Sequence, residues 1–265
     1  MNVFILILSL TLSVISIPSF AEINNLSQAI NESGRLRMLS QRMAKAYLLK
    51  AMDIQPEKAE LQFTSSLQKF ESNLSDLNLF STDLGAPAAI RVSLQTIESA
   101  WSTYKTELHK PAEQYSAASI LTQSDETLLA CETLVNELEK IAQRDSARWV
   151  NLSGRQRMLS QRIAKFYTAI SLTGEIQRYN GSLKQAIAEF DQALTDLIHS
   201  PDNTRFVNHK LQKVETQWNF SKQGFKLLDN GSSTPLVISM TTESILKQMN
   251  DITALYEEID KTKKQ

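Results

Sequence analysis

The sequence predicts an all-α protein that contains two tandem antiparallel four-helix bundles. Its seven glycines and six prolines gather at a few places, which leaves long stretches without helix breakers. Apolar residues in these stretches recur at i, i+3, i+4 and i+7, the spacing of an amphipathic helix. The pattern of the first half also returns about 120 residues later, so the chain reads as a tandem duplication.

The breakers divide the chain into eight expected helices. The first four cover 23–52, 57–80, 87–108 and 116–143, and the second four cover 144–172, 180–199, 203–228 and 235–261. We therefore expect one module over residues 22–143 and another over 144–265, each with short connections between its helices. Breaks are expected at Pro56, 85–87, 110–111, 174–181, 200–201 and 230–235.

Apolar positions of the two halves match in register. At an offset of 120, the apolar stripe of the second expected helix returns in the sixth. At an offset of 117, two apolar residues of the third expected helix return with the same spacing in the seventh. These pairs are Leu67, Phe70, Leu74 and Leu77 with Ile187, Phe190, Leu194 and Leu197, and Ile97 and Trp101 with Val214 and Trp218.

The junction between the halves lacks an obvious break. Between Ser119 and Ser171 there is no proline, and Gly154 is the only glycine. This predicts that the fourth helix continues as the fifth, giving one shared helix of about 75 Å that stacks the two bundles end to end.

Composition excludes several classes of function. The formal net charge of −1 gives no global attraction for nucleic acid. Cys131 is the only cysteine, so neither an intrachain disulfide nor a thiolate metal site is expected, and the three histidines stand far apart. No nucleophile–base pair and no glycine-rich phosphate loop is visible. We expect no enzyme activity, no metal and no cofactor.

The N-terminal segment predicts export. Residues 1–21 carry no charged side chain, hold an apolar run from Val3 to Ile17 and end in Ser19-Phe20-Ala21. This is typical of a secretory signal peptide with a small-x-small cleavage site, although its n-region lacks Lys and Arg. The predicted location is the periplasm. The alternative is retention as an inner-membrane anchor, because the run approaches the roughly 20 residues that span a bilayer.

One arginine-rich phrase occurs twice, 120 residues apart. The run GRLRMLSQR begins at Gly34, and GRQRMLSQR begins at Gly154. A helical wheel groups Gly34, Arg37 and Gln41 on one face, and the second copy repeats this group. Arg35 and Arg42 fall on a different face of the helix, which we expect to be solvated. No Asp or Glu lies at i±3 or i±4 of Arg37 or Arg157.

An arginine on a helix–helix seam without a carboxylate partner favours an anion, and its planar fork suits oxyanions and carboxylates. A glycine one turn earlier would allow close approach of a backbone or a small ligand. The alternative is that the phrase only packs, since arginines also extend along apolar surfaces to reach water. The candidate ligand-binding residues are Gly34, Arg37, Ser40, Gln41, Gly154, Arg157, Ser160 and Gln161.

SGRLRMLSQRMAK and SGRQRMLSQRIAK resemble the first-helix motif of the PilJ/NarX-type periplasmic sensor domain. This family includes the N-terminal domain of type IV pili methyl-accepting chemotaxis transducers and the periplasmic domain of nitrate- and nitrite-sensing kinases. The match runs through Gly34, Arg37, Met38 and Ser40, and again through Gly154, Arg157, Met158 and Ser160. The resemblance implies antiparallel four-helix bundles and, as in the kinases, an anion clamped at a dimer interface by one arginine from each subunit. That arginine corresponds to Arg37 and Arg157 here.

The resemblance thus implies a sensor-type protein that binds a small anion, nitrate- or nitrite-like or a carboxylate. Family members of known role continue into a second membrane span and a signalling module, whereas this sequence ends at Gln265, so we expect no signalling output of its own. The alternative function is a structural or adaptor protein that docks on a membrane sensor or on pilus-related machinery.

We expect the stacked geometry for the motifs, with a folded-back pair of bundles as the competing geometry. End-to-end stacking would separate Arg37 from Arg157, so that a two-arginine clamp would need a parallel homodimer with two sites. A pair of bundles folded back on each other would instead bring both motifs together across an internal pseudo-twofold, with one site per chain.

Overall fold

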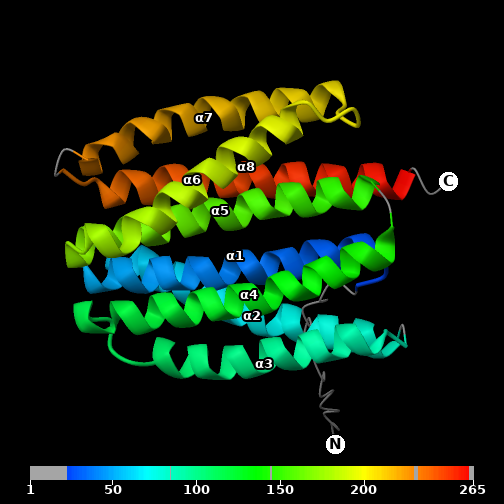
Figure 1. Ribbon diagram of the computed structural model, residues 1–265, viewed down its shortest axis with the longest axis horizontal. Coiled ribbons are helices and arrows are strands. Elements are labelled where there is room, and N and C mark those ends of the chain that lie inside the picture. The colour runs from blue at the N-terminus through cyan, green and yellow to red at the C-terminus, as the bar shows by residue number, and fades with distance from the viewer. Residues whose placement is uncertain (1–22, 84, 144, 230–231, 263–265) are drawn as a thin grey trace, which may run out of the picture.

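The computed structural model describes residues 23–83, 85–143, 145–229 and 232–262, and this part of the chain is built from α-helices (Figure 1). The all-α prediction is confirmed. The first half contains α1 (Leu26–Ala51), α2 (Pro56–Asp83), α3 (Ala88–Leu108), a 3-10 turn (Gln114–Ser116) and α4 (Ala117–Ala142). The second half contains α5 (Asp145–Thr173), α6 (Ile176–Ile198), α7 (Arg205–Asp229) and α8 (Pro235–Thr262).

Each helix lies close to its predicted range, and the largest difference concerns α6. The break expected over 174–181 is much shorter, because Gly174 alone makes the turn with a positive φ of 72°. Helix α6 then begins at Ile176 and carries Gly181 in its interior.

The predicted shared helix is wrong. Helix α4 ends at Ala142, Gln143 adopts the left-handed conformation with φ 49° and ψ 36°, and α5 begins at Asp145. A single non-glycine residue in this conformation costs about 1–2 kcal/mol, which is small beside the apolar area that a reversal of the chain can bury. The absence of proline and glycine was therefore a poor guide to helix continuity.

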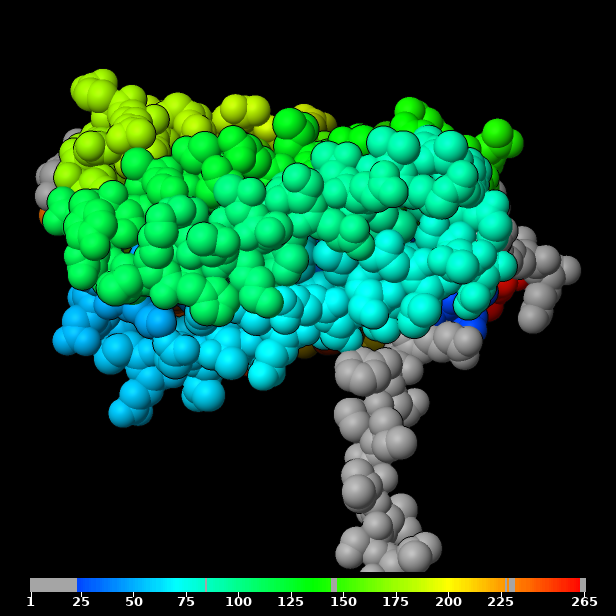
Figure 2. All heavy atoms as spheres, turned by 90° about the horizontal axis from the view of Figure 1, so that it is seen from below, coloured from blue at the N-terminus to red at the C-terminus, as the bar shows by residue number. Residues whose placement is uncertain are grey.

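Because the chain reverses here, the two halves lie side by side instead of end to end. Helices α1 and α5 run in the same direction along each other through the middle of the molecule (Figure 1). Helix α1 also packs on α2 and α4, and α5 on α6 and α8, while α3 and α7 lie on the outside against α4 and α8. Viewed from the side of the first half, α2, α3 and α4 cover most of α1 (Figure 2).

Helix α1 is buried on almost every side. Between Ser27 and Leu49, the partly exposed residues are Gln28, Glu32, Arg35 and Arg42, and all others are buried. Small side chains on its inner faces allow neighbouring helices to approach closely. They are Ala29, Ser33, Gly34, Ser40, Ala44 and Ala46.

The duplication is visible in the packing of the outer helices. Phe70 and Trp101 stack with ring centroids 4.4 Å apart, and their counterparts Phe190 and Trp218 lie 4.1 Å apart. The same aromatic pair therefore joins the second and third helix of each half. Among the described helices, none combines the length and apolar character that crossing a bilayer requires.

We predict that Gln143→Gly stabilises the protein. Glycine adopts the left-handed conformation without the steric cost that Gln143 bears, so the free energy of unfolding should rise by up to about 1 kcal/mol. Denaturant unfolding of the variant and the wild type measures the difference. If α4 and α5 were continuous in solution, the same change would lower stability by about 1 kcal/mol, because glycine would then interrupt a helix.

Candidate functional site

The two repeated motifs face each other across the α1–α5 interface. Arg37 is fully buried and Arg157 is 1% exposed, each on the inner side of its helix. A Cβ placed on Gly34 would lie 3.2 Å from Nη2 of Arg37 and 3.5 Å from Nη2 of Arg157. A Cβ on Gly154 would lie 3.7 Å and 3.1 Å from the same two atoms. Both guanidinium groups thus converge beside both glycines.

This arrangement corrects the stacked geometry, which would have kept the arginines apart. It is the folded-back alternative, in which both motifs meet across an internal pseudo-twofold. Two arginines of the repeated motif come together within one chain, and no second chain is required to bring them there.

Each arginine reaches across the interface to an asparagine of the other motif helix. Nη2 of Arg37 donates to Oδ1 of Asn151 at 2.7 Å, and Nη2 of Arg157 donates to Oδ1 of Asn31 at 2.8 Å. Arg157 also donates to the backbone carbonyl of Asn31 at 3.2 Å. The two asparagines stand 120 positions apart, the same offset that separates the arginines.

Carboxylates hold these asparagines in the orientation that the arginines need. Nδ2 of Asn31 donates to Glu257 at 2.8 Å, and Nδ2 of Asn151 donates to Glu139 at 2.6 Å. With its amide nitrogen engaged in this way, each asparagine turns its oxygen toward an arginine.

The pseudosymmetry fails at the remaining partner of each arginine. Nη1 of Arg37 forms an ion pair with Glu132 at 2.7 Å, whereas Nη1 of Arg157 donates to the neutral amide oxygen of Asn250 at 3.3 Å. No carboxylate of the described residues lies within ion-pair distance of Arg157.

Burial is the largest effect on the pKa of Arg157, which falls from 12.5 to about 9, and the nearby Arg35 and Arg37 lower it further. Burial alone would raise the pKa of Glu132, but Arg37 holds it below its usual value. The Nε atoms of both buried arginines have no hydrogen-bond partner among the described residues. The pair therefore has an excess of positive charge and of hydrogen-bond donors.

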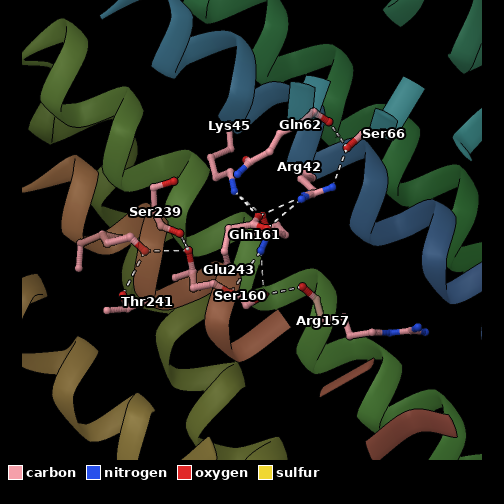
Figure 3. A network of polar contacts seen from close by, with 12 residues as sticks. Arg42, Lys45, Gln62, Ser66, Arg157, Ser160, Gln161, Ser239, Thr241 and Glu243 are labelled. Atoms are coloured by element: carbon pink, nitrogen blue, oxygen red, sulfur yellow. Dashed lines mark hydrogen bonds and ion pairs between the residues drawn. The ribbon is translucent and has the colours of Figure 1, made fainter. Parts of the chain in front are cut away.

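The serines and glutamines of the motif point elsewhere. Ser40 and Ser160 donate to the backbone carbonyls of Arg37 and Arg157 in their own helices, at 2.8 and 2.7 Å. Nε2 of Gln41 donates to Ser40 and to the carbonyl of Ser124, and Gln161 makes the equivalent bonds. In Figure 3 the guanidinium of Arg157 extends away from the network around Gln161.

That network forms a second polar layer about two turns further along the motif helices. The ammonium of the buried Lys45 contacts Glu243 of α8 and donates to Gln161 at 2.8 Å (Figure 3). Its counterpart Lys165 pairs with Asp125 of α4 at 2.8 Å. Each lysine thus pairs with a carboxylate of the opposite half, so this layer ties the halves together.

Burial lowers the pKa of both lysines to about 8. Burial would raise the pKa of Glu243, but Lys45 and Arg42 lower it to about 2. Arg42 binds Glu243 through two nitrogens at 2.8 and 3.1 Å, and its side chain is 20% exposed, so the expectation that Arg35 and Arg42 are solvated is wrong for Arg42. Arg35 is also only partly exposed and pairs with Glu32 at 3.2 Å.

A model of the family described as type IV pili methyl-accepting chemotaxis transducer N-term (PilJ) matches residues 19–127 and 142–237. The chain belongs to this family. The two matched segments are consistent with tandem PilJ copies, while the exact module limits 22–143 and 144–265 remain predictions. Neither the curated proteins nor the solved structures compared with the chain give a match.

Several residues of this PilJ site were missed at the sequence level. Asn31 and Lys45 recur at the offset of the motif, as Asn151 and Lys165, and this repetition was a usable signal. Glu132 carried no signal, since its counterpart in the second half is not acidic.

We predict that Gly34→Ala and Gly154→Ala lower stability, although alanine normally stabilises a helix interior by about 1 kcal/mol over glycine. The new methyl group would lie 3.2 Å (Gly34) or 3.1 Å (Gly154) from a guanidinium nitrogen, closer than ordinary van der Waals contact, and that nitrogen could move away only by straining its hydrogen bond to an asparagine. Gly181→Ala in α6 is the matched control, because nothing lies within 4 Å of its Cβ position, and it should stabilise by about 0.5–1 kcal/mol. Thermal unfolding of all three compares them. Equal stabilisation by the three substitutions would contradict the tight packing at the motif.

We predict that Glu243→Gln destabilises the protein by roughly 3–5 kcal/mol at neutral pH, because the buried Lys45 would lose the carboxylate that keeps its ammonium charged and would stay charged without a partner or give up its proton. The folded pKa of Glu243 lies below its unfolded value of about 4.5, so its contribution is complete above pH 4.5 and is lost as pH falls toward 2. The difference in unfolding free energy between wild type and variant should shrink over that range.

Asp251→Asn is the control for this experiment. Asp251 pairs with Lys210 at 2.8 Å but is 60% exposed, so its loss should change stability by less than about 1 kcal/mol. A pH-independent difference for Glu243→Gln would contradict the assigned role of Glu243.

Proposed function

We propose that this protein is an exported, sensor-type PilJ protein that binds one small anion between Arg37 and Arg157. The carrying observation is that two buried guanidinium groups converge at the α1–α5 interface, where Glu132 is the one carboxylate of the described residues in ion-pair contact with them. The ligand class is a small oxyanion, nitrate- or nitrite-like, or a small carboxylate.

The energetics of burial support this proposal. Removing an ion from water costs several kcal/mol even after the protein relaxes, and two like charges add repulsion to that cost. An anion beside both guanidinium groups would offset part of both terms, and the two Nε–H groups without partners supply donors for it. Because the arginines come from one chain, the proposed site requires no homodimer.

Family membership supports the proposed location and partners. Residues 1–21, predicted as a signal peptide with an inner-membrane anchor as the alternative, lie outside the described residues. Family members are linked to chemotaxis transducers and membrane sensors. We propose a periplasmic protein that presents its ligand state to such a membrane sensor.

The competing proposal is a helical adaptor without a ligand. It is favoured by the partners that the arginines already have, since Glu132, Asn31 and Asn151 accept four hydrogen bonds from the guanidinium nitrogens. In this account the polar layer only fixes the register of α1 against α5.

Thermal shift at constant ionic strength separates the two proposals. Nitrate, nitrite, formate, sulfate and phosphate are screened against wild type, Arg37→Ala, Arg157→Ala and the surface control Arg178→Ala, whose partner is the neighbouring Glu175. At one hundred times its dissociation constant, a bound anion adds about 2.7 kcal/mol, or roughly 5–10 °C in melting temperature. Arg178→Ala should keep the shift and the other two variants should lose it. No shift with any anion in the wild type would favour the adaptor.

Calorimetry then tests whether the two motifs share a ligand. We expect one anion per monomer, and either arginine substitution should abolish all binding. Two sites per chain, each lost with only one of the substitutions, would contradict a shared site.

A further inference from the structure

Glu132 and Asn250 occupy equivalent places in the two halves but differ in charge. They are separated by 118 positions, as are Asp125 from Glu243 and Glu139 from Glu257, which play matching roles in the two halves. Glu132 accepts from Nη1 of Arg37 and Asn250 accepts from Nη1 of Arg157. The two halves therefore differ at this position in the acceptor alone, which is a carboxylate for Arg37 and an amide for Arg157.

Counting the charges around the pair leaves one positive charge without compensation. Of the two buried arginines, Glu132 forms an ion pair with Arg37, while Arg155 and Arg162 act on it from a greater distance. The other carboxylates that influence Arg157 are Glu32 and Glu257, which act from beyond ion-pair distance. Glu32 is paired with Arg35 at 3.2 Å, and Glu257 is paired with Lys261 at 3.3 Å.

Glu132 also connects the pair to the surface. Its side chain is 27% exposed and lines a cleft of about 290 Å³ between α4, α5 and α6. Arg155 and Arg162 line the same cleft, but each faces a carboxylate there, Glu189 at 2.9 Å and Asp125 at 3.9 Å, so the cleft itself carries no excess of positive charge. Glu132 thus stands between the cleft and the buried arginines.

We infer that Glu132 acts as a built-in anion. It compensates one of the two arginine charges, so that one negative charge from a ligand compensates the other, and the site selects singly charged ligands. This inference rests on the proposed function. With Glu132 in place, a singly charged ligand brings the pair to neutrality. A doubly charged ligand would leave excess negative charge beside two buried arginines, so it is rejected even when its size is suitable.

The test exchanges the charges at the two equivalent positions with isosteric variants. Calorimetry at constant ionic strength measures the affinities of nitrate and sulfate for wild type, Glu132→Gln and Asn250→Asp. We expect wild type to prefer nitrate. Glu132→Gln should raise the ratio of sulfate to nitrate affinity at least tenfold, and Asn250→Asp should lower nitrate affinity at least tenfold, because Arg157 then has its own carboxylate.

Melting temperatures without added anion provide a second measurement. Asn250→Asp should raise the melting temperature and Glu132→Gln should lower it, and if Glu132→Gln does not fold, Asn250→Asp alone decides. A wild type that binds neither nitrate nor sulfate, nor any of nitrite, formate and phosphate, would overturn the proposed function. A wild type that binds nitrate, with unchanged selectivity in Glu132→Gln and unchanged nitrate affinity in Asn250→Asp, would overturn the role of Glu132 and leave the site standing.

Discussion

The packing of α1 against α5 brings two guanidinium groups together in a buried interface. The polar side chains around them are placed to compensate this buried charge. Because the two positive charges repel each other and both are removed from water, each hydrogen-bond acceptor near them stabilises the folded protein. Asn31 and Asn151 cross the interface to supply such oxygens, and their amides are oriented by carboxylates. Glycine at positions 34 and 154 leaves these guanidinium groups uncrowded, since a Cβ there would lie only 3.2 or 3.1 Å from a guanidinium nitrogen.

Gene duplication within one chain gives this interface a freedom that a homodimer lacks. In a symmetric dimer, like residues must meet, so a change on one side is always repeated on the other. Here Glu132 and Asn250 differ, and the net charge of the pair can be set to one positive charge instead of zero or two. The second layer keeps its symmetry, since Lys45 and Lys165 each find a carboxylate of the opposite half.

Local sequence signals predicted the helices well and their assembly poorly. Prolines, glycines and apolar stripes located all the helices of the described chain, because these features act within a few residues. The turn at Gln143 was missed, since nothing in its sequence marks a left-handed residue that tertiary packing stabilises. The motif identified Arg37 and Arg157, but Glu132 lies on another helix, and only the fold brings it to Arg37.

The central claim is that one anion is shared by two arginines within a single chain. A crystal structure of bromide-soaked protein, measured at the bromine absorption edge, tests it most directly, because the anomalous signal locates the ion without reference to the surrounding model. We expect one internal bromide per chain, within hydrogen-bond distance of both Arg37 and Arg157. Bromide absent from the α1–α5 interface, or bound at two separate positions each touching one arginine, would contradict the account.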